Sequence, residues 1–109
     1  MNAMVPPAYT GFEVKLGYSP LAFLYGFAQV FVVINGTILP AKWGAQFYPA
    51  VPGRYRIACY MRYLVAQQAG LNVLEGDLFP GQVIRVTWKA PFTVFNKGPM
   101  HWEIIAGPR

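Results

Sequence analysis

The stretch that most constrains the fold runs from Pro52 to Leu64. It opens with Pro52-Gly53, a pair that suits the centre of a type II turn, because proline presets one φ and glycine tolerates the positive φ that follows. The residues after this pair alternate, as in a strand with one buried face. One side carries Tyr55, Ile57, Cys59, Met61 and Tyr63, and the other carries Arg54, Arg56, Ala58, Tyr60 and Arg62. The pattern predicts a half-buried strand with an arginine stripe on its open face.

A second stretch repeats this design. Pro80-Gly81 leads into an alternating run in which Trp88 faces one way while Arg85 and Lys89 face the other. Like charges directly opposite each other destabilise a sheet, so we expect these cations to be staggered or neutralised. If both strands lie in one sheet, they present a shared basic face to a partner. That predicted basic face consists of Arg54, Arg56, Arg62, Arg85 and Lys89.

The rest of the chain also favours strands. Residues 12–16 alternate, and residues 29–34 are apolar on both faces, which is typical of a central strand. Asn35-Gly36 is the strongest short signal for a hairpin, since both residues tolerate positive φ. Ten prolines and eleven glycines indicate many turns. We therefore expect one all-β domain over residues 1–109, a single antiparallel β-sandwich of Ig-like or PEGA-like type with about seven short strands and a loose lead at 1–11.

Two apolar clusters are candidates for contact with a partner. The aromatic side chains in residues 21–27 either cap one end of the sandwich or project into solvent as a docking patch. A second cluster lies late in the chain. The predicted apolar contact residues are Phe23, Tyr25, Phe27, Phe92, Phe95 and Trp102. The hydrophobic fraction of 55% exceeds what a solitary soluble monomer needs, which favours a partner.

Residue types that support catalysis are scarce, with one histidine, one cysteine and four acids. Cys59 is predicted to face the core as a small hydrophobe, out of reach of His101 for a nucleophilic pair. The sequence contains no CxxC or HxxxH spacing, no phosphate-binding glycine loop and no GxSxG elbow. Glu75-Gly76-Asp77 is interpreted as a solvated turn. We therefore predict no enzymatic activity, no metal site and no cofactor.

The net charge of +5 is compatible with simple solubility or with attraction to phosphate groups of lipid or nucleic acid. A single nucleic-acid strand would follow the arginine stripe and stack on Tyr60, but one aromatic makes a thin stacking platform. The apolar run at 21–34 is shorter than the roughly 20 residues of a membrane span, and a buried strand is favoured. No basic residue precedes Lys15 and no small-residue cleavage site follows an early apolar run, so we expect no secretory signal and a cytoplasmic protein that can associate with a membrane.

Several short motifs occur in a fixed order: Ile34-Asn35-Gly36, Trp43-Gly44, Val51-Pro52-Gly53-Arg54, Met61-Arg62-Tyr63-Leu64, Trp88-Lys89-Ala90-Pro91, Phe95 and Gly98. In this order the region from about Val32 to Gly98 resembles a family of small actinobacterial proteins. The sequence of hairpin, Pro-Gly turn and strand is also similar to the PEGA-type β domains of bacterial surface and membrane-linked proteins. The resemblance implies a small β-sandwich near the cytoplasmic membrane, with no assigned activity.

These features predict a non-enzymatic protein-interaction or structural module, either an oligomer or a subunit of a larger assembly at a membrane surface. The expected partner is another protein or further copies of the chain, with an anionic membrane surface as an additional partner. Two alternatives stay open. One is a nucleic-acid-binding β domain that uses the arginine stripe, and the other is a structural protein of a phage particle.

Overall fold

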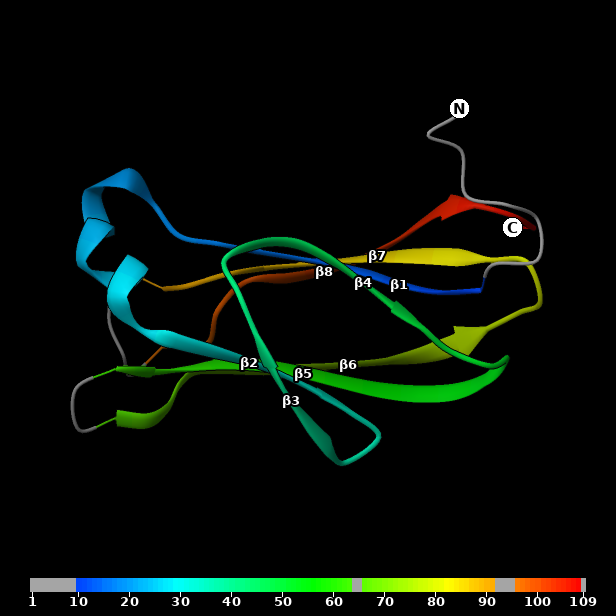
Figure 1. The fold of residues 1–109 in the computed structure, drawn as a ribbon, viewed down its shortest axis with the longest axis horizontal. Helices are drawn as coiled ribbons and strands as arrows, with labels where there is room; N and C mark the ends of the chain where they lie inside the picture. Colours follow the sequence, from blue (N-terminus) through cyan, green and yellow to red (C-terminus); the bar gives the residue numbers. More distant parts are fainter. Residues whose placement is uncertain (1–9, 64–65, 92–95, 109) are drawn as a thin grey trace.

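The computed structural model describes residues 10–63, 66–91 and 96–108, and leaves the side chains of residues 20–23 undescribed. Within these ranges the chain forms eight strands and one 3-10 helix (Figure 1). In chain order the elements are β1 (Gly11–Gly17), η1 (Pro20–Phe27), β2 (Gln29–Ile34), β3 (Thr37–Ala41), β4 (Gly44–Pro49), β5 (Gly53–Tyr63), β6 (Ala66–Leu78), β7 (Val83–Lys89) and β8 (Met100–Ala106).

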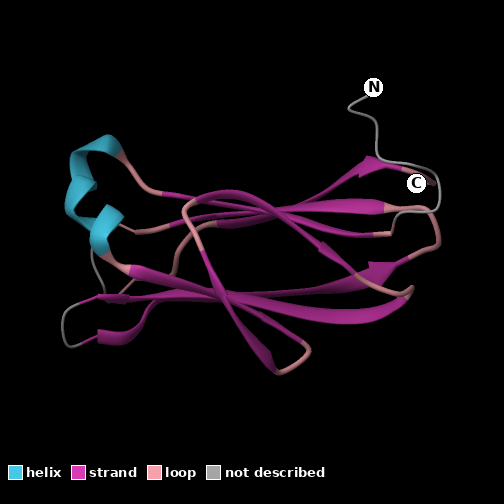
Figure 2. Cartoon of the chain, in the orientation of Figure 1, coloured by secondary structure: helices cyan, strands magenta, loops and turns pink. Residues whose placement is uncertain are grey.

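The strands form two four-stranded sheets packed face to face, as Figure 2 shows. Sheet A has the order β4-β1-β7-β8, and sheet B has the order β3-β2-β5-β6. The prediction of an all-β fold with two packed layers is confirmed. The predicted number of strands was too low by one, and the sandwich is not purely antiparallel, because β1 pairs parallel with β7.

The parallel pair arises because β1 and β7 both begin at the same end of the molecule. The Gly81 amide donates to the Thr10 hydroxyl, and the Gly11 amide donates to the Gln82 carbonyl at 3.2 Å. Since the chain crosses from β6 in sheet B to β7 in sheet A at this end, β7 must run in the direction of β1. Their register extends from Gly11↔Val83 to Gly17↔Lys89.

The core lies between the sheets and follows the alternation of the strands. Phe12 and Val14 of β1 face Ile57 and Cys59 of β5, and all four side chains are fully buried. The inward residues of β7 are Ile84, Val86 and Trp88. Each large apolar side chain buried in this way contributes about 1.5–3 kcal/mol relative to an exposed one. The inward face predicted for residues 55–63 is therefore the sheet B half of the core.

The Asn35-Gly36 turn joins β2 to β3 as the sequence predicted. Both residues have positive φ, 48° and 85°, as a type I′ turn requires. The Asn35 side chain adds two bonds to the next strand, since its Oδ1 accepts from the Arg56 amide at 2.8 Å and its Nδ2 donates to the Arg54 carbonyl at 3.3 Å. The hairpin is thus fixed to β5 as well as to itself.

The expected turn at Glu75-Gly76-Asp77 is wrong, because these residues lie inside β6. Opposite them on β5 are Arg56, Tyr55 and Arg54. Opposite charges across a strand pair stabilise the extended conformation. The glycine has a packing role, since a Cβ at Gly76 would lie 2.6 Å from Cζ2 of Trp102.

Helix η1 closes one end of the sandwich, at the left of Figure 1, where β1, β5 and β7 end and β2, β6 and β8 begin. The Tyr25 ring is buried and packs edge-on to Tyr63 at 4.8 Å between centroids. Among the described residues, no helix has the length and apolar character needed to cross a lipid bilayer.

The opposite end carries the β4–β5 connection and a turn at Phe79–Gln82. The Gln82 amide donates to the Phe79 carbonyl at 3.1 Å, and Gly81 has φ 76°. These features match a type II turn at Pro80-Gly81, whereas the type II turn predicted at Pro52-Gly53 is wrong, because Gly53 of β5 has φ 158° and already pairs with Leu78. One end of the sandwich is therefore closed by a short helix and the other by turns.

Candidate functional site

Two arginines of β5 are neutralised within sheet B. Arg54 lies 3.7 Å from a carboxylate oxygen of Glu75 and 3.4 Å from one of Asp77. Arg56 lies 3.8 Å from the other oxygen of Glu75. Each of these exposed ion pairs contributes only about 0–1 kcal/mol to the stability of the fold. They nevertheless leave neither arginine without a nearby carboxylate.

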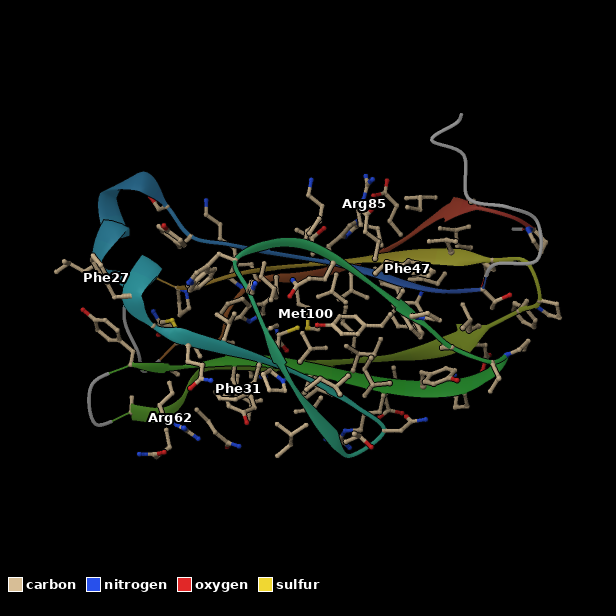
Figure 3. The ribbon with its side chains drawn as sticks, in the orientation of Figure 1. Phe27, Phe31, Phe47, Arg62, Arg85 and Met100 are labelled. Carbon is tan, nitrogen blue, oxygen red and sulfur yellow. The ribbon has the colours of Figure 1, made fainter. Side chains whose placement is uncertain are left out.

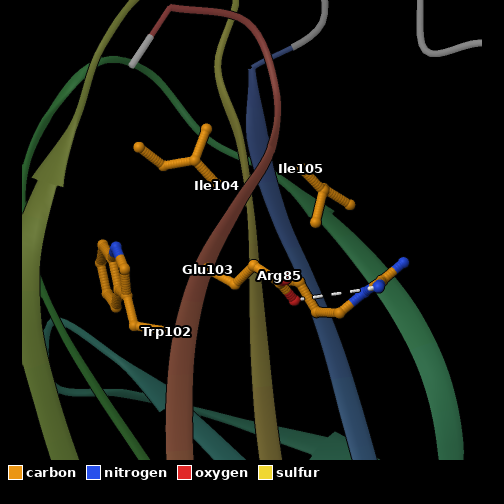
Figure 4. A pocket seen from close by; sticks show the side chains of 5 residues that line it. All are labelled: Arg85, Trp102, Glu103, Ile104 and Ile105. Atoms are coloured by element: carbon orange, nitrogen blue, oxygen red, sulfur yellow. Dashed lines mark ion pairs between the residues drawn. The ribbon is translucent and has the colours of Figure 1, made fainter.

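Arg85 is neutralised in the same way on the outer face of sheet A. Its Nε donates to Glu13 Oε1 at 2.6 Å, and its Nη1 lies 4.0 Å from Glu103 Oε1. Figure 4 shows this second pair beside β8, with Trp102 and Ile104 on the other side of the strand. The open depression here has a volume of about 530 Å³ and is lined by Arg85 and residues 102–105. It offers apolar side chains and one carboxylate, that of Glu103, which is paired with Arg85.

The predicted basic face is wrong as a single surface. Arg54, Arg56 and Arg62 belong to β5 in sheet B, whereas Arg85 and Lys89 belong to β7 in sheet A. Because both strands turn their apolar sides to the core, their basic sides face opposite directions. Figure 3 shows Arg62 and Arg85 on the two outer sides of the sandwich. The expectation that the cations would be neutralised holds for three of the five.

Five other cations have no acidic side chain within 4.0 Å among the described residues, which include all four acids of the chain. They are Lys15, Lys42, Arg62, Lys89 and Lys97, and all five are exposed. Their strand register places them at the end closed by η1, because Gln29 is opposite Arg62, Gly17 is opposite Lys89, and Gly70 bridges to Lys97. The charges of the molecule are thus separated along its length.

The five cations surround this end on every side. Lys15 and Lys89 lie on the outer face of sheet A, and Arg62 lies on the outer face of sheet B, 5.1 Å above the Phe31 ring. Lys42 lies in the β3–β4 connection, where its backbone exchanges two hydrogen bonds with the Gln46 side chain at 2.6 and 2.8 Å. Lys97 lies beside β6 on the opposite edge.

Apolar side chains project from the centre of the same end. Phe27 is 88% exposed and Leu24 is 52% exposed, while Tyr25 between them is only 6% exposed. Both expectations for residues 21–27 are therefore met in part, since Tyr25 caps the core and Phe27 projects into solvent (Figure 3). We call the surface formed by Leu24, Phe27 and the five free cations the η1 end.

The predicted apolar contact residues do not all join this surface. Trp102 is half-buried and packs edge-on to Phe12 at 5.7 Å, so it belongs to the core, as Tyr25 does. The side chain of Phe23 and the residues Phe92 and Phe95 lie outside the described part of the chain. Of the six predicted residues, Phe27 is the one that the structure places in solvent.

A tight contact around Trp88 fixes the strands that carry Lys89 and Lys97. The Trp88 Nε1 donates to the Gly70 carbonyl at 2.9 Å, and the Gly98 amide donates to the same carbonyl at 2.8 Å. The Asn72 side chain donates to the Gly98 carbonyl at 2.9 Å. This contact ties β6 to β7 and to the segment that precedes β8. Among the described residues, the buried Trp43 Nε1 has no hydrogen-bond partner.

The single cysteine is chemically protected. Cys59 is fully buried, and burial raises the pKa of its thiol from 9.0 to about 12. His101 is exposed on the outer face of sheet A, opposite Thr87, and therefore cannot reach Cys59. In the described ranges, His, Cys, Asp and Glu form no group of three that could hold a metal ion.

The nucleic-acid alternative needs an accessible aromatic face beside the arginines. Tyr60 is only 5% exposed and stacks on Phe31 at 5.1 Å between centroids. Tyr63 points inward against Tyr25. Neither ring presents a face on which a base could stack.

The fold and the η1 end together define a two-layer β domain with a cationic, apolar-tipped end. No protein-family model, no curated protein and no solved structure matches the chain.

Proposed function

We propose that the protein is a non-enzymatic interaction module that docks on an anionic partner through the η1 end. The separation of charge carries this proposal. All four acids are paired with arginines, Glu75 and Asp77 towards the opposite end and Glu13 and Glu103 on Arg85 in the middle of sheet A, while the five described cations without acidic partners gather around the η1 end.

Cations gathered without counter-charges repel one another, and an anionic partner relieves that repulsion. The molecule measures 41 × 28 × 20 Å, and the Debye length at physiological salt is about 8 Å. The ion-paired Glu75 and Asp77, towards the far end of the long axis, are therefore screened from the η1 end, and Glu13, which lies two residues from Lys15 on β1, is neutralised by Arg85. The exposed Phe27 adds apolar contact area to the same surface.

A matched pair of double variants tests this proposal. Lys15→Gln/Lys89→Gln and Arg54→Gln/Arg56→Gln each lower the net charge from +5 to +3, the first at the η1 end and the second at the opposite end. We expect wild type to bind immobilised heparin in a salt-dependent way, the first variant to elute at lower salt, and the second to elute near wild type. Equal losses in both variants, or no retention of wild type, would contradict the proposal.

A second candidate function, self-association, is favoured by the outer face of sheet B. This face is apolar at its centre, where a groove of about 280 Å³ is lined by Val33, Ala58, Leu71 and Val73 among others. Ile38 beside it is 57% exposed. We expect wild type to be a dimer in light scattering and Leu71→Lys to be a monomer. A monomeric wild type at high concentration would rule this function out.

The Ig-like or PEGA-like type of the sandwich is part of the proposal, as is the cytoplasmic location. The order of hairpin, Pro-Gly pair and long strand supports the PEGA-like type. The hairpin is formed by β2 and β3, the long strand is β5, and β2 and β5 are neighbours in one sheet. Because a fold of this type does not by itself imply a function, the proposed binding role rests on the η1 end and not on the type of sandwich.

A further inference from the structure

We propose that the anionic partner of the η1 end is a lipid bilayer, which the sandwich contacts tip first; this inference rests on the function proposed above. The arrangement of the free cations is the first reason. They lie on both outer faces and on both edges around one tip, as the positions of Lys15, Arg62, Lys42 and Lys97 show. A flat anionic surface perpendicular to the long axis can contact all of these cations at once, whereas a linear polyanion such as heparin contacts only those on the side along which it lies.

The second reason is the apolar centre of the same tip. Phe27 is the most exposed of the large apolar side chains described, and Leu24 lies beside it on the same short helix. A soluble polyanion gives these side chains little to bury against. The interfacial region of a bilayer accepts apolar side chains at its acyl boundary while lipid headgroups bind the surrounding cations.

The third reason is a depression that suits a headgroup. It has a volume of about 230 Å³ and is lined mostly by apolar groups of β1, β4 and β7, with Lys15, Thr87 and Lys89 supplying polar groups. Thr87 lies directly between Lys15 on β1 and His101 on β8 in the register of the sheet. Two ammonium groups and a hydroxyl can all donate hydrogen bonds to phosphate oxygens.

The distribution of acids agrees with this orientation. In a tip-first contact, Glu75 and Asp77 lie towards the far end of β6, where Arg54 neutralises them. Glu13 and Glu103 are held by Arg85 on sheet A. The carboxylate nearest to these cations is that of Glu13, two residues from Lys15 on the outer face of β1, and Arg85 neutralises it, which limits its repulsion of an anionic surface.

Sedimentation with vesicles tests the inference. We expect wild type to bind vesicles that contain phosphatidylglycerol and to remain free with vesicles of phosphatidylcholine alone. Each cation near an anionic membrane strengthens binding about fivefold, so Lys15→Gln/Lys89→Gln should weaken partitioning about 30-fold. Phe27→Ser should weaken it by about tenfold or more without loss of folding, because the side chain lies in solvent. Arg54→Gln/Arg56→Gln should bind as wild type does.

Phe27→Ser separates this inference from the proposed function. If it binds both heparin and phosphatidylglycerol vesicles as tightly as wild type does, the bilayer inference is overturned while docking on an anionic partner stands. If wild type binds heparin but no vesicle, the bilayer inference is likewise overturned, and docking on an anionic partner stands. If wild type binds neither probe, both proposals are wrong. If Phe27→Ser binds vesicles more weakly than wild type and binds heparin equally well, the bilayer inference is supported.

Discussion

The contact of Trp88 with Gly70 and Gly98 yields a stability prediction that can be worked out from the structure. At Gly70, φ is 71°, a conformation that costs a residue with a Cβ about 1–2 kcal/mol. A Cβ there would also lie 2.8 Å from Cζ2 of Trp88 and 2.7 Å from Cδ of Pro91. Forcing an extra carbon into packed surroundings costs about 1–3 kcal/mol. Gly70→Ala should therefore lower the free energy of unfolding by about 2–5 kcal/mol.

Gly36→Ala is the matched control. Gly36 has φ 85°, and a Cβ there would meet no atom within 4 Å, so the variant carries only the backbone penalty of about 1–2 kcal/mol. Gly98→Ala isolates the packing penalty, because the glycine has no left-handed φ and its Cβ would lie 2.6 Å from the Lys89 carbonyl oxygen and also against Trp88 Nε1.

Urea unfolding of the three variants, followed by tryptophan fluorescence, measures these differences. We expect Gly70→Ala to lose more stability than Gly36→Ala by about the packing penalty, 1–3 kcal/mol. If the two lose the same amount, the Trp88 contact is loosely packed, and the reasoning that it ties β6 tightly to β7 is refuted.

Three further predictions concern single side chains. Burial raises the pKa of the Cys59 thiol to about 12, so the thiol of the folded protein should resist alkylation at pH 8, and fast labelling would contradict this. The free energy of unfolding should not depend on this thiol below pH 9, and it should fall by about 1.4 kcal/mol per pH unit between pH 9 and 12, because only the unfolded state loses the proton there. Arg85→Gln should cost about 1–2 kcal/mol because it breaks a 2.6 Å charged hydrogen bond, whereas Arg54→Gln should cost less than about 1 kcal/mol in the same urea assay; the reverse order would contradict the pairing described. Asn35→Ala should cost about 2–4 kcal/mol, since it removes two bonds to β5 at a residue with φ 48°, and an unchanged urea midpoint would contradict the role of its side chain.

The local structure was predictable because it depends on near neighbours in the sequence. Alternation in residues 12–16 and 55–63 identified both strands and their buried faces, and Asn35-Gly36 identified the hairpin. The layer to which each strand belongs was not predictable, because alternation tells which face is buried and not which strand is adjacent. This is why Arg54 and Arg85 were expected on one surface and lie on opposite ones.

The candidate site depended on the same missing information. Phe27 was named from the sequence, but nothing local distinguished it from Tyr25, which turns inward two residues earlier. Lys15, Lys42 and Lys97 were not singled out, because they come together only through the topology of the two sheets. The pairing of every acid with an arginine also involves contacts between distant strands, such as Glu13 with Arg85.

Mapping of backbone amide signals by NMR tests most directly whether the η1 end is the contact surface. The ¹⁵N-labelled protein is titrated with nanodiscs that contain phosphatidylglycerol, with phosphatidylcholine nanodiscs as the control. We expect the signals of Lys15, Phe27 and Lys89 to shift or broaden first, while those of Arg54 and Asp77 at the opposite end keep their positions. Changes centred on Arg54 and Asp77, or spread evenly over both ends, would contradict the account.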